Sequence, residues 1–331
     1  MFIIENYSIA VVFCVITMLA WGSWANTQKL APDSWRFELF YWDYVIGILL
    51  FSLLFALTAG SLGDGGRPFL EDLTQADSSN IGSAVLGGVL FNAANILLVA
   101  SITLAGMSVA FPVGIGLALV VGVIVNYIDA PVGNATLLFG GVGFIVLAIL
   151  LNANAYRKLT AQQQKVPTKG LLLAVVAGLL MGLFYKYVAN SMFPDFKNPL
   201  VGKLSPYTAV FLFSFGIFAS NFVFNTLLMR KPFEGAPVTF KDYFAGSGKT
   251  HWMGILGGVI WCIGMSFSIL ASDKAGPAIS YGLGQGATVV AALWGIFVWK
   301  EFEGAPKGVS GMLNLMLLLY VIGLGLIIVA R

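Results

Sequence analysis

The chain has 331 residues, of which 58% are hydrophobic and 10% are charged, and its mean hydropathy is +0.88. A soluble domain needs a far more polar surface, so this composition excludes a soluble protein and indicates a polytopic membrane protein. The formal net charge of +3 gives no sign of a nucleic-acid partner, and we predict none.

Apolar runs of membrane-spanning length follow one another along the chain. A helix needs about 20 residues to cross the hydrocarbon core of a bilayer. Ten such runs lie near residues 8–30, 39–60, 81–103, 107–128, 134–153, 168–190, 206–229, 251–271, 276–298 and 312–330. The first run is not read as a signal peptide, because it has no basic start and no small-residue cleavage site. The sequence therefore predicts an all-α membrane protein with ten transmembrane helices.

The two halves of the sequence are related to each other. Residues 87–120 recur at 257–290 without a gap, with Gly-Gly-Val, Ala-Gly and Gly-x-Gly at matching positions. Each half carries five spans, and an odd number makes the second half enter the membrane from the opposite side. We therefore predict two inverted five-helix repeats, residues 1–160 and 161–331, joined by a polar linker at 154–169. Inverted repeats of this kind are typical of transporters.

Lysine and arginine are unevenly divided between the two sides that these spans define. One side holds twelve of them, which are Lys29, Arg36, Arg157, Lys158, Lys165, Lys169, Arg230, Lys231, Lys241, Lys249, Lys300 and Lys307. The other side holds six, which are Arg67, Lys186, Lys197, Lys203, Lys274 and Arg331. Because short cytoplasmic loops carry the excess of basic residues, we expect a multi-pass protein of the plasma (inner) membrane with both termini outside the cytoplasm.

Polar and aromatic side chains within the spans are candidates for a solute site. Such groups are costly in hydrocarbon unless they face a partner or a wet cavity. Stacking rings combined with neutral hydrogen-bonding groups suit sugars and heterocyclic amides. The candidate substrate-binding residues are Trp21, Trp24, Asn26, Asn92, Asn95, Tyr185, Lys186, Asn221, Trp261, Tyr281 and Gln285. The alternative is that they join helices to one another, or, for Lys186, that its side chain reaches the membrane interface.

Two acidic residues at the start of the second span are candidates for proton coupling. Asp43 is the first choice and Glu38 is the second. A carboxylate that is enclosed by apolar walls in one state and wet in the other could take up and release a proton. The alternative is a solvated acid at the first turn of a helix, where the helix dipole favours negative charge.

The sequence lacks the patterns of an enzyme or a cofactor site. The segment 246–250 ends like a phosphate-binding loop, but Tyr243 stands where that motif needs glycine. His251 is the only histidine, and Cys14 and Cys262 fall in different spans. Neither a catalytic triad nor a metal site can be assembled from them. We predict that the protein is not an enzyme and uses no cofactor.

Several short motifs become informative when they are taken together. They are Trp21-Gly22-Ser23-Trp24, Tyr41, Asp43-Tyr44, Ala56-Leu57-Thr58, Gly60 to Gly63, and Asn126-Tyr127 through Asp129. This set resembles the plant ureide permeases and the related bacterial glucose, ribose and rhamnose porters of the drug/metabolite transporter (DMT) superfamily. The resemblance runs nearly end to end. It implies two inverted five-helix halves, proton-coupled uptake, and a central cavity lined by spans one, three, four, six, eight and nine.

These observations predict a secondary active transporter that imports a small neutral polar solute with protons. Sugars and ureide or nucleobase-like compounds both need stacking and neutral hydrogen bonds, so both classes stay open. An exporter of the same superfamily is one alternative, although the first span has no carboxylate between Ser8 and Leu30 to bind a cationic drug. A passive channel is the other alternative. The sequence makes no prediction of the oligomeric state.

Overall fold

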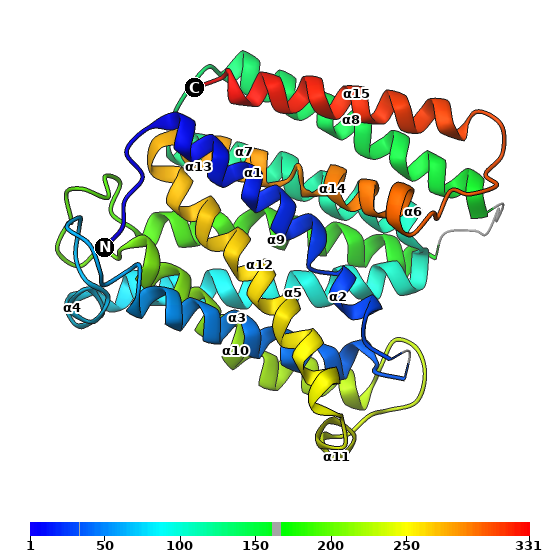
Figure 1. Ribbon diagram of the computed structural model, residues 1–331, viewed down its shortest axis with the longest axis horizontal. Coiled ribbons are helices and arrows are strands. Elements are labelled where there is room, and N and C mark those ends of the chain that lie inside the picture. Colours follow the sequence, from blue (N-terminus) through cyan, green and yellow to red (C-terminus); the bar gives the residue numbers. More distant parts are fainter. Residues whose placement is uncertain (33, 161–166) are drawn as a thin grey trace.

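A computed structural model describes residues 1–32, 34–160 and 167–331 as a bundle of long helices (Figure 1). Within these ranges the structure contains no β-strand, and ten helical segments are long and apolar enough to cross a membrane. The prediction of an all-α protein with ten spans is therefore confirmed. The predicted linker, 154–169, and the boundary between the predicted repeats include residues 161–166, which lie outside the described residues, as does Lys165.

The described part of the first half contains eight α-helices and one π-helical turn, and these include five spans. These are α1 (Tyr7–Ser23) and α2 (Asn26–Lys29), α3 (Phe37–Leu57), α4 (Phe69–Gln75), α5 (Ser78–Ala105), α6 (Met107–Ala110), the π-helical η1 (Phe111–Ile115), α7 (Gly116–Asp129) and α8 (Ala135–Thr160). Spans one to five are α1 with α2, α3, α5, η1 with α7, and α8. Helices α4 and α6 lie outside these spans.

The second half also contains five spans. Its elements are α9 (Thr168–Ser191), α10 (Pro206–Arg230), α11 (Phe240–Phe244), α12 (Gly248–Ala275), α13 (Pro277–Gly284), α14 (Ala287–Leu293), the π-helical η2 (Trp294–Val298) and α15 (Val309–Ile328). Spans six to ten are α9, α10, α12, α13 with α14 and η2, and α15. Both α5 and α12 contain 28 residues, and each ends at a glycine with positive φ, 78° at Gly106 and 83° at Gly276. Only glycine adopts this backbone readily, so it permits the tight turn into the next span.

Helices α5 and α12 pack in matching ways. Helix α5 contacts α9 and α10, and α12 contacts α1 and α3. A methyl group at Gly88 of α5 would collide with the carbonyl of Phe213 on α10. In the same way, one at Gly258 of α12 would collide with the carbonyl of Tyr44 on α3. Small residues let helices approach closely in lipid, so the repeated Gly-Gly-Val motif marks two equivalent packing positions.

Spans four and nine both depart from a regular α-helix at the repeated Gly-x-Gly motif. In span four the π-helical η1 carries Pro112 and runs into Gly116. Proline has no backbone N–H to donate, which favours an irregular turn. In span nine the helix breaks between Gly284 and Ala287, so α13 and α14 are separate helices. Irregular backbone at membrane depth is tolerated where it is buried in protein or lines a cavity.

Both chain termini lie at the same end of the bundle, and α8 and α15 lie side by side along one edge (Figure 1). At this end the backbone N–H of Asn134 donates to the carbonyl of Ala330, and the N-terminal amine donates to the carbonyl of Gly65. The other end carries α2, the start of α9 and α11. An even number of spans requires this arrangement.

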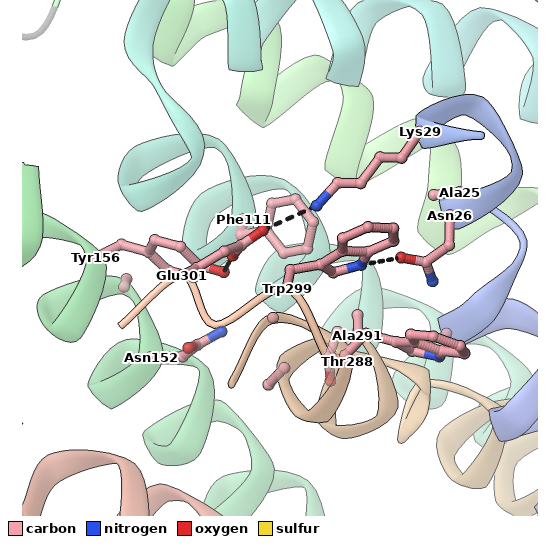
Figure 2. Close-up of a pocket in the computed structure, with 15 residues that line it drawn as sticks. Ala25, Asn26, Lys29, Phe111, Asn152, Tyr156, Thr288, Ala291, Trp299 and Glu301 are labelled. Carbon is pink, nitrogen blue, oxygen red and sulfur yellow. Dashed lines mark hydrogen bonds and ion pairs between the residues drawn. The ribbon is translucent and has the colours of Figure 1, made fainter. Parts of the chain in front are cut away.

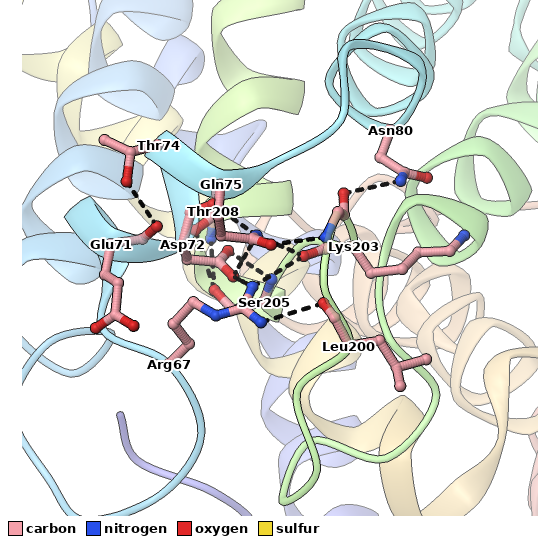
Figure 3. A network of polar contacts seen from close by, with 11 residues as sticks. Arg67, Glu71, Asp72, Thr74, Gln75, Asn80, Leu200, Lys203, Ser205 and Thr208 are labelled. Atoms are coloured by element: carbon pink, nitrogen blue, oxygen red, sulfur yellow. Dashed lines mark hydrogen bonds and ion pairs between the residues drawn. The ribbon is translucent and has the colours of Figure 1, made fainter.

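A buried carboxylate holds the loops at the end of the termini (Figure 3). Asp72 on α4 is fully buried and pairs with Arg67 at 3.0 Å. Its second oxygen accepts the backbone N–H of Ser205 at 2.7 Å. Gln75 accepts the N–H of Gly202 and donates to the carbonyl of Lys203. The loop before span three is therefore clamped to the loop before span seven.

We expect Asp72→Asn to lower the thermal unfolding midpoint of the detergent-solubilised protein. The substitution turns a charged acceptor into an amide that can satisfy only part of the network, and hydrogen bonds to charged groups contribute about 1.5–3 kcal/mol. Glu71→Gln is the matched control, because Glu71 is the exposed neighbour on the same helix. Equal midpoints for the two variants would contradict a role of the Asp72 network in stability.

Candidate functional site

A cavity of about 190 Å³ lies at the centre of the bundle, beside the two irregular spans. Its walls come from spans one, three, four, six, eight and nine, the same six that the family resemblance implies. The lining residues are Trp21, Gly22, Trp24, Ala25, Phe91, Asn95, Leu98, Phe111, Ile115, Met181, Phe184, Trp261, Gln285, Ala287, Thr288 and Ala291. All of these side chains are uncharged, so the cavity is built for a neutral solute.

Aromatic rings form one wall of the cavity. Trp21 and Trp261 are stacked with ring centroids 5.8 Å apart, and Phe91 packs on Trp261 at 4.4 Å. The indole N–H of Trp21 donates to the backbone carbonyl of Trp261 at 3.1 Å, which fixes the orientation of the ring. Gly264 and Gly284 leave the room that the Trp21 ring occupies, since a methyl group at either position would contact it. The glycines thus shape an aromatic platform.

Two side-chain amides give the cavity its hydrogen-bonding groups. Asn95 donates to the Tyr41 hydroxyl at 3.1 Å, and Tyr41 donates in turn to Asn92 at 2.9 Å. Asn92 then donates to Ser220 on α10 at 2.9 Å. This chain of bonds leaves the Oδ1 of Asn95 without a partner among the described residues, so it can accept from a solute. Within the same ranges the side-chain amide of Gln285, at the break in span nine, has no protein partner either.

A second chamber of about 150 Å³ continues the cavity away from the termini (Figure 2). It shares Gly22, Ala25, Phe111, Thr288 and Ala291 with the central cavity. We call it the vestibule. Because the two chambers share five wall residues, they form one path from the centre of the bundle toward α2.

An ion pair lies at the mouth of the vestibule. Lys29 of α2 pairs with Glu301 at 2.9 Å, and the Tyr156 hydroxyl donates to the other oxygen of Glu301 at 2.6 Å. Partial burial opposes ionisation, but the bonds from Tyr156 and Lys29 hold the pKa of Glu301 below its ordinary value. The indole N–H of Trp299 donates to Asn26 at 2.6 Å beside this pair (Figure 2). These contacts join spans one, five and nine.

A separate polar cluster surrounds Asp43, which is almost fully buried on α3. Its Oδ1 accepts from the Tyr243 hydroxyl at 2.6 Å and lies 2.9 Å from Nδ1 of His251. Burial, together with the nearby carboxylate, raises the pKa of Tyr243, so the phenol stays protonated and donates. The Oδ2 of Asp43 is buried without a partner among the described residues. The cluster therefore contains a carboxylate and a histidine that could share a proton.

The chain is similar in sequence to a known family of membrane proteins. The family model described as ureide permease matches residues 40–169 and 159–330. This chain belongs to the ureide permease family. Ureide permease 1 of Arabidopsis thaliana is 22% identical over 385 aligned positions that cover 99% of this chain and 98% of the relative. Ureide permease 2 of the same plant is 24% identical and covers 97% and 96%.

A further relative matches about half of this chain, and a solved structure aligns with nearly all of it. Transmembrane protein 144 homolog B of Dictyostelium discoideum is 26% identical over 49% of this chain and 40% of its own. A crystal structure of a protein aligns over 97% of this chain and 96% of its own, with a TM-score of 0.56 and 15% identity, which shows the likeness of fold alone. The family relatives are named permeases, so this ureide permease family member is a membrane transporter and not an enzyme.

The structure divides the predicted substrate-binding residues of this family member into three groups. Those that line the central cavity are Trp21, Trp24, Asn95, Trp261 and Gln285. Asn26 lines the vestibule instead. Those that line neither chamber are Asn92, Tyr185, Lys186, Asn221 and Tyr281. Asn92 accepts a hydrogen bond from Tyr41, which in turn accepts from the cavity residue Asn95. Asn221 is fully buried on α10, and its amide atoms have no partner among the described residues.

Two tyrosines from the prediction lie in a packed layer between the cavity and the end of the termini. Tyr281 is fully buried, and its hydroxyl donates to the carbonyls of Ala118 and Met181 at 3.1 and 3.2 Å. Tyr185 is also fully buried and donates to the carbonyl of Ser268 at 3.1 Å. We call this layer, built around Tyr185 and Tyr281, the seal. It closes the cavity on that side.

Lys186 and the acidic candidates lie away from the cavity. Lys186 pairs with Asp129 at 3.1 Å, at the end of the bundle that carries the termini. Glu38 pairs with Arg36 at 2.5 Å. Asp43 contacts His251, as described above. The two chambers are lined by neither Asp43 nor Glu38, so any coupling by these acids must act through the helices that carry them.

The structure adds residues that the sequence did not single out as candidates. Phe111, Met181 and Phe184 line the central cavity, and Tyr41 orients Asn95. Glu301 is the one acidic residue among those that line the two chambers. The position of Phe111 in the repeat was the available signal, because its counterpart 170 residues later is Tyr281.

We expect Tyr281→Phe to lower thermal stability without changing solute affinity. The substitution removes one hydroxyl from the seal, and a buried hydrogen bond contributes about 1 kcal/mol. Thermal unfolding and equilibrium binding measured on the same preparation check this. A loss of affinity at unchanged stability would instead place Tyr281 among the solute-binding residues, as the sequence predicts.

Proposed function

We propose that this chain is a secondary active transporter that imports a small neutral polar solute, with ureides and nucleobase-like amides as its substrate class. The observation that supports this best is the chemistry of the central cavity, which combines a tryptophan platform with the amides of Asn95 and Gln285. A planar cyclic amide stacks on indole rings and both donates and accepts in its own plane. The names of the plant relatives favour the same class.

The membrane arrangement follows from the same proposal. We assign the chain to the DMT superfamily with two inverted repeats, residues 1–160 and 161–331. The matched packing of α5 and α12 supports this assignment, as does the irregular helix of spans four and nine at the same motif. The end with twelve basic residues is the cytoplasmic side, so both termini are outside the cytoplasm at the plasma membrane. One half rocks against the other around the cavity.

Import is driven by protons, and Asp43 is the coupling carboxylate with Glu38 as the second candidate. The contact of Asp43 with His251 supports the first choice, because it places the only histidine of the chain against a buried carboxylate. Histidine changes charge near neutral pH more readily than any other side chain. Helix α3 carries Asp43, and its neighbour Tyr44 packs on Trp24 of the cavity wall with centroids 4.5 Å apart. A change at Asp43 can reach the cavity through this contact.

Uptake into proteoliposomes tests the proposal. Three radiolabelled solutes are compared, which are a cyclic ureide, a pyrimidine base and a monosaccharide. Each is tested with and without a pH gradient in which the outside of the vesicle is more acidic than the inside. We expect the ureide or the base to accumulate only with the gradient, and the monosaccharide not to accumulate. Accumulation of the sugar would overturn the substrate class, and uptake that ignores the gradient would overturn proton coupling.

Two further measurements separate this function from the alternatives. A carrier exchanges labelled for unlabelled solute across the membrane and saturates, whereas a passive channel does neither. An exporter would give accumulation only when the gradient is reversed. The neutral lining of the cavity speaks against export of cationic drugs, which need a buried carboxylate at the binding site.

A further inference from the structure

Ion pairs lie at both ends of the path through the protein. At the end of the termini, Asp129 at the end of α7 pairs with Lys186 of α9 at 3.1 Å and accepts from Asn190 at 2.8 Å. At the opposite end, Glu301 pairs with Lys29 at the mouth of the vestibule. All four charged side chains of these pairs are partly exposed, with side-chain exposures between 23% and 47%. They are therefore pairs at the edge of water that can form and break.

The Asp129–Lys186 pair has a counterpart in the repeat, and that counterpart lies beside Glu301 and Lys29. Residues of spans four and nine correspond with an offset of 170, so Asp129 corresponds to Trp299. Spans six and one correspond through their contacts with the central helices, since Gly87 approaches the carbonyl of Phe184 as Gly257 approaches that of Trp24. By this register Lys186 corresponds to Asn26. The bond between Trp299 and Asn26 is thus the counterpart of the bond between Asp129 and Lys186.

Glu301 and Lys29 lie next to this second contact, and Lys29 follows Asn26 by three residues. Trp299 and Glu301 are two residues apart, and the ammonium group of Lys29 also lies 4.6 Å from the centroid of the Trp299 ring. Spans six and four are joined at one end, and spans one and nine at the other. Each contact therefore joins the first span of one half to the fourth span of the other half.

The protein is closed differently at its two ends. Beneath Asp129 and Lys186 lies the seal, in which Tyr185 and Tyr281 are fully buried. Beneath Glu301 and Lys29 lies the vestibule. The repeat counterpart of Tyr281 is Phe111, which lines both chambers, and the counterpart of Tyr185 is Ala25, which also lines both. Equivalent positions are therefore packed together in one half of the path and open in the other.

We propose that Asp129–Lys186 and Glu301–Lys29 are the two gates of the transport path and that they open in alternation. The structure is the state in which a thick seal closes the end of the termini, whereas the Glu301–Lys29 gate and the contacts beside it close the vestibule. In the opposite state the seal comes apart, Tyr281 and Tyr185 face a chamber beneath Asp129, and Phe111 is packed away. This inference rests on the proposed carrier function and names the residues that control access to its site.

Thiol accessibility in nanodiscs tests the gates without any solute. The two native cysteines, both fully buried, are replaced by alanine. A reporter cysteine is then placed in the vestibule as Asn152→Cys or in the seal as Ala118→Cys, and the rate of labelling by a charged maleimide is measured. Glu301→Gln is expected to raise the labelling rate of the vestibule reporter by about fivefold and to lower that of the seal reporter. Opposite changes are required if the variant shifts the population from one state to the other.

Asp129→Asn is expected to do the reverse, with faster labelling in the seal and slower labelling in the vestibule. Lys186→Gln breaks the same gate from the other partner and serves if Asp129→Asn does not fold. Exchanging the charges, as Lys29→Glu with Glu301→Lys, should return labelling toward that of the parent, whereas each single exchange should not. Lys274→Gln is the matched control, because it removes an ion pair with Asp273 at the end of the termini without touching either chamber.

Changes of the same direction at both reporters, or no change in either variant, would overturn the alternating gates. Uptake measured on the same variants keeps the two proposals apart. Labelling that responds as expected in a protein that accumulates no ureide or base leaves the gates standing and overturns the proposed substrate. Gradient-driven uptake with labelling that ignores Glu301 and Asp129 does the opposite.

Discussion

Gln285→Leu is expected to weaken solute binding by about tenfold or more while the protein remains folded. Gln285 is the side chain at the break in span nine, it lines the central cavity, and it has no protein partner among the described residues. A solute amide that loses its partner inside a closed cavity keeps the cost of leaving water, about 1–3 kcal/mol. The leucine fills a similar volume, so stacking on Trp21 and Trp261 is retained.

The repeat supplies a matched control for this prediction. Ile115 is the counterpart of Gln285 in span four, and it lines the same cavity. Ile115→Leu changes the shape of the wall but removes no hydrogen-bonding group, so affinity should change far less. Scintillation proximity binding of the labelled ureide or base checks both variants, with thermal unfolding alongside. If Gln285→Leu binds as tightly as the parent, Gln285 is not a solute contact.

The sequence predicted the helices well because each rule it used acts locally. Apolar runs of membrane length predicted the ten spans. The repeated motifs that the sequence showed lie at equivalent structural positions, since Gly106 and Gly276 of the Ala-Gly pairs both have positive φ, and Gly88 and Gly258 of Gly-Gly-Val both approach a neighbouring helix closely. Helical spacing also brought Trp21 and Trp24 together on the cavity wall.

The sequence pattern could not show where the backbone departs from a regular helix. Tyr281, Gln285 and Thr288 share one face of an unbroken helix, but the backbone breaks after Gly284, so Tyr281 belongs to α13 and Thr288 to α14. Tyr281 then lies in the seal while Gln285 and Thr288 line the cavity. A sequence pattern also cannot distinguish the two states of a carrier, in which the same residue is packed or open.

Contacts between distant residues were equally out of reach. Glu301 follows the last turn of span nine and reads as an ordinary solvated acid, yet Lys29 and Tyr156 hold it at the mouth of the vestibule. His251 stands at the junction of a loop and a span, 208 residues from Asp43, and only the packing of α12 on α3 joins them. No periodicity in either helix reports such a meeting.

Asp43→Asn is expected to abolish gradient-driven accumulation while leaving exchange of labelled for unlabelled solute intact. The amide has the shape of the carboxylate and can still accept the Tyr243 hydroxyl, so the cluster should keep its packing. It cannot take up a proton, and His251 loses the charge that faces it. Exchange needs only the movement of the loaded carrier, whereas accumulation needs a proton to move with the solute.

Glu38→Gln separates the two acidic candidates for coupling in the same assay. Glu38 lies on the same helix and pairs with Arg36, and its backbone carbonyl accepts from Asn225. If Asp43 carries the proton, Glu38→Gln accumulates solute and Asp43→Asn does not. Accumulation by Asp43→Asn at the rate of the parent would instead exclude Asp43, and a loss confined to Glu38→Gln would transfer the coupling role to Glu38. Because both acids lie on α3 and outside the two chambers, a loss of accumulation in either variant identifies α3 or its neighbours as the element through which protonation reaches the cavity.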